Sequence, residues 1–242
     1  MEKIKISAVS YTNTKPFIYG IQHSPVLEQI NLSLDIPSEC AKKLIENQVD
    51  IGLIPVAAIP FVPNAQIISS FCIGSIGAVN SVFIFSDVPV QEIKSVKLDS
   101  QSRTSNNLAK VLLKNHFKVE VEFTTDQSAK TDAIVLIGDR TFGRKEDFNY
   151  VYDMGEEWMK FTGLPFMYAA WVANKPIPET FLKEFDVALA KGIANIPTVI
   201  TQLPAIDGID ISDYLLHKLN FELTEEKLQA KDIFLKFISQ LD

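Results

Sequence analysis

The stretch Val96-Lys97-Leu98-Asp99-Ser100-Gln101-Ser102-Arg103-Thr104-Ser105 and the ten residues after it indicate the fold class. Residues 96–98 form a short strand pattern, and residues 99–103 form a polar loop. Residues 104–115 carry apolar side chains at 108, 111 and 112, a spacing typical of one helix face. Two more strands are predicted at 119–123 and at the strictly apolar run 133–137, which ends at Gly138-Asp139.

The first third of the chain has a similar order of elements. Strands are predicted at 4–9, 32–36 and 50–54, and helices at 17–22 and 38–47, with Ser38 as the N-cap of the second helix. A β-α-β-α-β unit implies a parallel sheet with right-handed crossovers. Two similar units without a sequence repeat predict two lobes.

Two long apolar stretches, 78–86 and 165–173, are predicted to be strands that cross from one lobe to the other. The tail carries helix patterns at 178–194 and 224–241. We therefore expect an α/β protein in which residues 1–86 and 174–242 form lobe one and residues 87–173 form lobe two. A cleft that closes around a ligand is expected between the lobes.

Composition limits the classes of partner. The 242 residues carry a net charge of −7 and a pI near 5.1, which argues against nucleic acid as the main partner. No apolar run reaches about 18 residues, so no membrane span is expected. The start of the chain lacks the apolar segment of a signal peptide, which favours a cytoplasmic protein. Nothing in the sequence indicates an oligomeric state. Cys40 and Cys72 favour buried thiols, with a disulfide left open.

Two polar loops follow predicted strands and are candidate ligand sites. Ser102 to Ser105 opens a helix, where backbone N–H groups favour an anion, but a plain cap by Thr104 or Ser105 explains the same residues. Asn13, in the loop after the first strand, can contact a ligand or form an Asx-turn before Pro16. The residues alone leave both pairs of interpretations open.

Other positions carry weaker signals. Ile54-Pro55-Val56 is mostly core whose backbone can line a pocket, and Ser81 either faces a cleft or is a buried strand hydroxyl. No metal motif, phosphate-binding loop, dinucleotide fingerprint or nucleophile elbow is present, so neither a metal nor a cofactor is expected. The carboxylates show no paired spacing. An enzyme with this sequence is expected to work mainly by holding its substrate.

Four strings together resemble the chorismate dehydratases, the first enzymes of the futalosine route to menaquinone. They are Val9 to Phe17, Asp50 to Val56, Leu98 to Ser105 and Thr162-Gly163-Leu164-Pro165-Phe166. The similarity spans roughly residues 4–173 in the same order. It implies a type-2 periplasmic-binding-protein fold in a cytoplasmic enzyme that converts chorismate to 3-[(1-carboxyvinyl)oxy]benzoate.

The resemblance also implies roles for individual residues. Thr104 and Ser105, with Ser102 beside them, would bind one carboxylate of the dianionic substrate. Asn13 and Ser81 match family positions near the ring and would orient the substrate and its hydroxyl. The chain departs from the family pattern after Gly138-Asp139-Arg140, where it has Thr141-Phe142 in place of small or aliphatic residues.

The sequence leaves two alternative functions open. The 1,4-dihydroxy-6-naphthoate synthase of the same pathway shares the fold, but it has a Cys-Pro-Asn-Asp-type first loop and a histidine base in its second half. This chain has Thr12-Asn13-Thr14 there and no histidine between His116 and His217. The other alternative is a non-catalytic protein that binds a small carboxylate.

Overall fold

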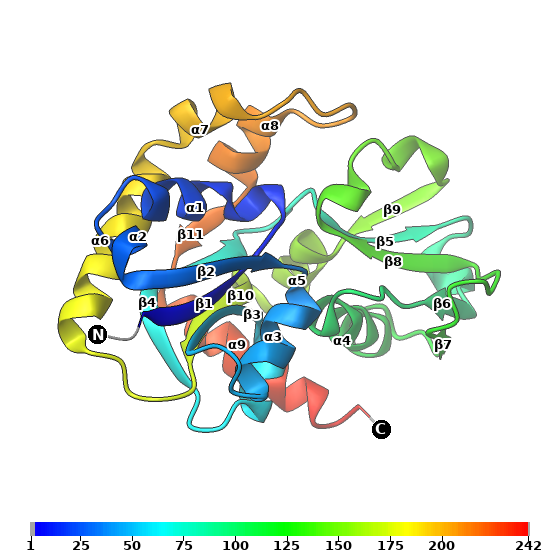
Figure 1. Cartoon of the computed structure of the whole chain (residues 1–242). Coiled ribbons are helices and arrows are strands. Elements are labelled where there is room, and N and C mark those ends of the chain that lie inside the picture. The colour runs from blue at the N-terminus through cyan, green and yellow to red at the C-terminus, as the bar shows by residue number, and fades with distance from the viewer. Residues whose placement is uncertain (1–2, 242) are drawn as a thin grey trace. The chain divides into compact units, whose positions relative to one another are not determined.

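The computed structural model describes residues 3–241, and its contacts divide the chain into two compact units (Figure 1). Unit 1 consists of residues 1–74, 167–204 and 220–224. Unit 2 consists of residues 75–166, 205–219 and 225–242. Among the described residues, no helix is long and apolar enough to cross a membrane.

The core of unit 1 is a six-stranded sheet in the order β11-β4-β10-β3-β1-β2. Its strands are β1 (Ile4–Val9), β2 (Ile30–Asp35), β3 (Ile51–Pro55), β4 (Gln66–Ser75), β10 (Phe166–Ala173) and β11 (Asn220–Glu222). Its helices are α1 (Lys15–Gln22), α2 (Val26–Gln29), α3 (Pro37–Ile45), α6 (Glu179–Ala194) and α7 (Ile196–Gln202), with 3-10 turns η1 (Thr12–Thr14) and η2 (Val56–Phe61).

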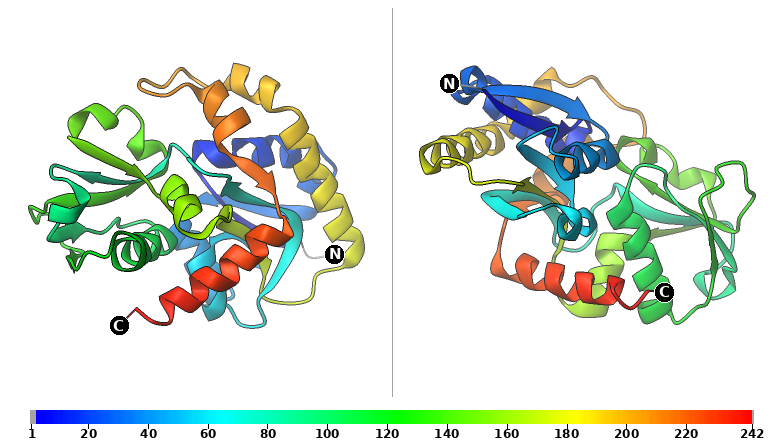
Figure 2. Two further views of the ribbon diagram at one scale, coloured as in Figure 1. Left: turned by 180° about the vertical axis from the view of Figure 1, so that it is seen from behind. Right: turned by 60° about the horizontal axis from the view of Figure 1, so that its bottom comes forward.

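Helices α1 and α6 lie side by side in this unit (Figure 1, Figure 2). Their backbones touch where two glycines meet. A Cβ atom at Gly20 would lie 1.9 Å from the Ala188 carbonyl oxygen, and one at Gly192 would lie 1.9 Å from the Pro16 carbonyl oxygen. Only glycine permits this approach, so these two positions set the distance between the helices.

Unit 2 is built on a five-stranded sheet in the order β7-β6-β8-β5-β9. Its strands are β5 (Val82–Ser86), β6 (Ser95–Lys97), β7 (Glu122–Thr124), β8 (Ala133–Ile137) and β9 (Tyr150–Asp153). Its helices are α4 (Arg103–Val111), α5 (Met154–Thr162), α8 (Ile211–Asp213) and α9 (Glu225–Ile238), with π-helical turns η4 (Leu112–Phe117) and η7 (Tyr214–Lys218) and 3-10 turns η3 (Val90–Glu92), η5 (Gly138–Thr141) and η6 (Lys145–Asp147).

The two sheets share one topology. Strand β1 pairs in parallel with β2 and β3, and β6 pairs in parallel with β7 and β8. In each sheet the third strand then pairs antiparallel with a strand from elsewhere in the chain, β10 beside β3 and β5 beside β8. The predicted β-α-β-α-β unit is therefore confirmed in unit 1, and the similar unit in unit 2 has the same three parallel strands with one helix, α4, since no helix separates β7 from β8.

The units differ from the expected lobes in where the chain passes between them. The chain passes from unit 1 to unit 2 after residue 74 and returns after residue 166, earlier than the expected 86 and 173. The segments 205–219 and 225–242 belong to unit 2, whereas we expected them in lobe one. Aromatic packing explains the placement of α9. Phe234 lies edge-on to Trp158 and to Phe166, with ring centroids 5.9 and 5.0 Å apart, and Phe237 packs on Phe161.

Several predicted boundaries are corrected. The helix expected to begin at Ser38 begins at Pro37 with Ile36 at the N-cap position, because proline fits the first helical turn. The strand expected from Ala78 begins only at Val82. Asn80 is left-handed, with φ 60°, and its N–H donates to the Asp153 carboxylate instead of a neighbouring strand. Both cysteines are buried thiols, and burial raises the pKa of Cys40 to about 12.

A polar network surrounds Asp35, the last residue of β2 in unit 1. The Asp35 carboxylate accepts hydrogen bonds at 2.7 Å from the Lys43 ammonium and from the Ser7 and Ser33 hydroxyls. Burial raises the pKa of this carboxyl, but the three donors outweigh burial, so the pKa lies below its ordinary value. The network therefore stabilises the fold only while Asp35 is ionised.

We expect Asp35→Asn to lower the free energy of unfolding by about 1–2 kcal/mol at pH 7, because the ammonium loses its counter-charge. Since the folded-state pKa is depressed, this stabilisation is present above about pH 4 and is lost as pH falls through the folded-state value. Urea unfolding at pH 7 and pH 3 measures the difference. Glu179→Gln, in the exposed pair with Lys183, is the matched control and should change nothing. A deficit of equal size at both pH values would contradict this assignment.

Candidate functional site

Polar segments of unit 2 gather at one edge of its sheet. The register pairs Val82 with Ile137 and Phe83 with Asp153 in antiparallel strands, and Lys97 with Ile134 in parallel strands. The start of β5, the ends of β6 and β8 and the end of β9 therefore share this edge. In α/β sheets, ligands bind outside the carboxyl ends of the parallel strands.

The loop after β6 carries three buried hydroxyls at the start of α4. Ser102 is the N-cap, and its Oγ accepts a hydrogen bond from the Ser105 backbone N–H at 3.1 Å and lies 3.0 Å from the Ser105 Oγ. Ser102, Thr104 and Ser105 are 5%, 1% and 3% exposed. The cap is thus Ser102, and the expectation of Thr104 or Ser105 was wrong because the helix begins earlier, at Arg103.

An ion pair with a buried carboxylate fixes this loop. The Asp99 carboxylate, whose side chain is fully buried, accepts hydrogen bonds at 2.8 and 2.7 Å from the Arg140 guanidinium. It also accepts the Gln101 N–H at 2.7 Å, while Asn106 bonds both the N–H and the carbonyl of Asp99 through its side-chain amide. Sequence reasoning missed this pair. Its only signal was that Asp99 and Arg140 each follow the end of a parallel strand.

Ser81 lies at the same edge, immediately before β5. Its side chain is 2% exposed, and its Oγ accepts a hydrogen bond from the Tyr214 hydroxyl at 2.9 Å. Its carbonyl accepts the N–H of Gly138, the first residue of η5. Because η5 also carries Arg140, one short turn contacts both Ser81 and Asp99.

Tyr214, the hydrogen-bond partner of Ser81, also lines a hollow of about 230 Å³. The hollow is lined by the following residues of unit 2: Asn80, Thr141, Phe142, Lys145, Gly208, Ile209, Asp210, Asp213 and Tyr214. The Lys145 ammonium donates to the Asn80 side-chain oxygen at 2.8 Å. Thr141 and Phe142, where the chain departs from the resembled pattern, are therefore pocket residues in this structure.

The backbone leading to Ser81 is held by a second buried carboxylate. Asp153 accepts hydrogen bonds from the N–H groups of Val79 and Asn80 and caps α5 through those of Gly155 and Glu156. Burial raises the pKa of Asp153, and the four backbone donors oppose that shift. This carboxylate is thus occupied in positioning the chain.

In unit 1 the predicted residues also share a sheet edge. Asn13 lies in η1, after the end of β1, is partly exposed, and its side-chain oxygen accepts the Thr14 hydroxyl at 3.1 Å. Ile54 to Val56 end β3 and begin η2, all buried. The side chains of Ile54 to Val56 are therefore core, as expected for most of that segment.

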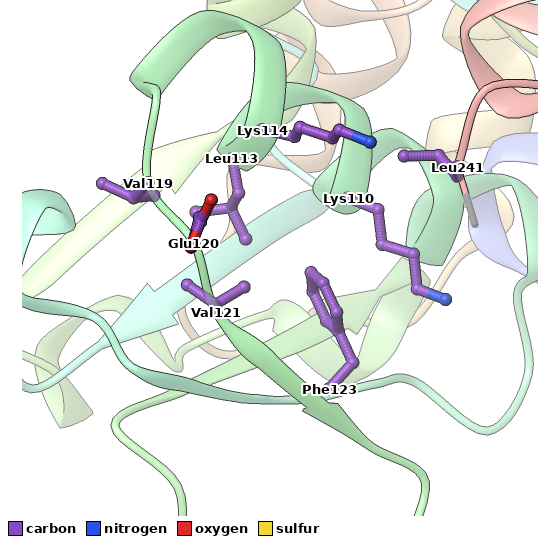
Figure 3. A pocket seen from close by; sticks show the side chains of 8 residues that line it. All are labelled: Lys110, Leu113, Lys114, Val119, Glu120, Val121, Phe123 and Leu241. Carbon is purple, nitrogen blue, oxygen red and sulfur yellow. The ribbon is translucent and has the colours of Figure 1, made fainter.

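A separate hollow of about 290 Å³ in unit 2 is lined by the following residues: Lys110, Leu113, Lys114, Val119, Glu120, Val121, Phe123 and Leu241. Figure 3 shows the side chains of Leu113, Val121 and Phe123 turned toward one another. The Lys110 ammonium lies 5.3 Å from the Phe123 ring centroid. Lys110 comes eight residues after Ser102, about 12 Å along the helix, so this hollow is distinct from the polar edge.

Residues 4–240 match the protein family described as menaquinone biosynthesis. The chain belongs to this family. A chorismate dehydratase of Thermus thermophilus is 24% identical over 217 residues, which cover 78% of this chain and 77% of that relative. No group of three or more His, Cys, Asp or Glu that could hold a metal ion occurs among residues 3–241.

Solved structures share the fold. Protein AF1704 from Archaeoglobus fulgidus has a TM-score of 0.72 at 12% identity and covers 98% of this chain and 97% of its own. The Candida albicans CA3427 gene product, described as having the generic periplasmic-binding-protein fold, has a TM-score of 0.70 at 11% identity, covering 100% and 91%. The alkanesulfonate-binding protein SsuA from Xanthomonas axonopodis pv. citri, bound to MOPS, has a TM-score of 0.62 at 12% identity and covers 97% of this chain and 93% of its own. The predicted type-2 periplasmic-binding-protein-like fold is confirmed.

We expect Arg140→Ala to lower the free energy of unfolding by about 2–3 kcal/mol, because it leaves the buried Asp99 carboxylate without its cation. Arg144→Ala, which removes a partly exposed pair with Asp147 in the same segment, should cost below about 1 kcal/mol. Thermal or urea unfolding of both variants makes the comparison. Equal losses in the two variants would show that Asp99 does not depend on Arg140.

Proposed function

We propose that this protein is a hydro-lyase that removes water from chorismate to give 3-[(1-carboxyvinyl)oxy]benzoate in menaquinone biosynthesis. The observation that carries the proposal is the start of α4, where the string that resembles the dehydratases forms a capped helix N-terminus with three buried hydroxyls. Family membership and the chorismate dehydratase relative support the same reaction.

The start of α4 suits one carboxylate of a dianion. The helix dipole favours negative charge at the start of a helix. Because the Ser105 N–H already donates to the Ser102 Oγ, the hydroxyls are the donors that we propose for the substrate. We assign one substrate carboxylate to Thr104 and Ser105, with Ser102 beside them as the cap. Arg103 lies between these positions and is exposed. The binding energy then comes from hydroxyl donors that the fold already holds in place.

We assign Asn13 and Ser81 to the ring and its hydroxyl, and the backbone of Ile54 to Val56 to substrate binding. An amide donates and accepts hydrogen bonds, and a serine hydroxyl can donate one to the departing oxygen. Neither group needs to ionise. This fits a site whose two characterised carboxylates, Asp99 and Asp153, are already bound by guanidinium and backbone donors.

The reaction needs little acid–base help from the protein. A ring C–H bond breaks and its electron pair forms the last double bond of an aromatic ring, while the ring C–O bond breaks and the oxygen leaves. We propose that a carboxylate of the substrate accepts the proton and passes it to the leaving hydroxyl, which departs as water. The protein supplies orientation and a dry pocket.

The direct test is to incubate the purified protein with chorismate and follow the mass of the product. Loss of 18 daltons is the expected result, because one water leaves. Chorismate that is bound but recovered intact would overturn the dehydratase and support a carboxylate-binding protein. Chorismate that is neither bound nor converted would instead direct attention to the later naphthoate synthase.

For the anchoring residues, we expect Ser105→Ala and Thr104→Val each to raise KM about 10-fold with a smaller change in kcat, since they remove uniform binding to the carboxylate. Ser100→Ala, at an exposed serine of the same loop, is the matched control and should behave as the unmodified protein. Steady-state kinetics with chorismate measures both constants. Unchanged KM values would move the carboxylate elsewhere.

For the ring-orienting residue of unit 1, we expect Asn13→Ala to lower kcat by about 10–100-fold, because a misplaced substrate loses the oriented geometry. The same steady-state assay measures this loss. Turnover equal to that of the unmodified protein would remove Asn13 from the mechanism.

A further inference from the structure

The hydroxyl of Tyr214 and the hydroxyl of Ser81 form a buried side-chain pair. They are 2.9 Å apart, 133 positions apart in sequence, and 1% and 2% exposed as residues. Most side-chain hydrogen bonds in proteins go to backbone or water, and pairs of side chains are the minority. This pair also borders the hollow of about 230 Å³ that Tyr214 helps to line.

The fold holds Tyr214 from several directions. Phe142 packs edge-on against its ring, with centroids 5.5 Å apart at 74°. The Asp210 carboxylate caps α8, accepting the N–H groups of Ser212 and Asp213, and Tyr214 follows directly. The preceding loop passes so close to η5 and η6 that a Cβ atom at Gly208 would lie 2.1 Å from the Gly143 Cα. Phe142 therefore holds the ring of Tyr214, while the α8 cap and the close approach of Gly208 to Gly143 hold the chain segment that carries it.

The chemistry of the two hydroxyls sets the direction of their hydrogen bond. A phenol, with a pKa near 10, is a stronger donor and a weaker acceptor than an aliphatic alcohol. Tyr214 therefore donates and Ser81 accepts, in the sense the geometry gives. A hydroxyl that accepts a hydrogen bond becomes a better donor through its own hydrogen, because hydrogen bonds in a chain polarise one another.

We infer that Tyr214 is a positioning residue for the reaction, which keeps the Ser81 hydroxyl in one rotamer and oriented as a donor toward the leaving oxygen. This inference rests on the proposed function. It also assigns a purpose to Phe142, where the chain departs from the resembled pattern: the Phe142 ring supports Tyr214.

The test is Tyr214→Phe, which removes only the hydroxyl and keeps the ring against Phe142. We expect kcat with chorismate to fall about 10-fold while KM changes less than about 2-fold, because the lost interaction acts in the transition state. In a Ser81→Ala background the same substitution should have no further effect on kcat, since the hydroxyl it positions is absent. A purely structural role would lower the free energy of unfolding and leave kcat unchanged.

Tyr152→Phe is the matched control. The Tyr152 hydroxyl is also hydrogen-bonded within unit 2, accepting the Val90 N–H at 2.8 Å, but it does not contact Ser81. It should leave kcat unchanged and lower stability about as much as Tyr214→Phe does. Chorismate turnover with unchanged kcat in Tyr214→Phe would overturn the inference alone. No turnover by the unmodified protein would overturn the proposed function and the inference with it.

Discussion

The buried carboxylate of Asp99 is the constraint on which the polar edge of unit 2 depends. Removing a carboxylate from water costs several kcal/mol unless it is paired and hydrogen-bonded. Arg140 supplies the charge, and the Gln101 N–H supplies a further donor. The loop after β6 and the turn after β8 must therefore stay together, and the start of α4 is fixed where they meet. Because Gly138 in that turn also bonds the Ser81 carbonyl, the same constraint extends to the start of β5.

Two buried carboxylates at this edge are committed to structure. Asp99 is paired with Arg140. Asp153 accepts hydrogen bonds from four backbone N–H groups, two in the first turn of α5 and two at Val79 and Asn80. The groups that we propose for the ligand are instead hydroxyls at a helix N-terminus. Such a set binds an anion and orients a leaving group without moving protons of its own. A reaction driven by aromatisation suits this chemistry.

The repeated topology explains why the polar loops occur where they do. Each sheet has three parallel strands with the first in the middle, β2-β1-β3 and β7-β6-β8, so the loop after the middle strand lies at a switch in strand order. In unit 1 that loop carries Asn13, and in unit 2 it carries Ser102 to Ser105. The two units thus present polar groups at corresponding positions on similar sheets, although their sequences are not alike.

The sequence by itself determined the alternation of strands and helices, because the periodicity of apolar residues is a local property. Residues 133–137 were predicted as a strand to the residue, and the three parallel strands of each sheet follow from the same patterns. Tertiary structure alone decided which groups meet. Asp99 and Arg140 are 41 positions apart, Ser81 and Tyr214 are 133 apart, and the last helix packs in unit 2 through Phe234. An apolar face or a polar loop shows that a partner is needed, but the partner is chosen by the path of the chain, which local spacing does not encode.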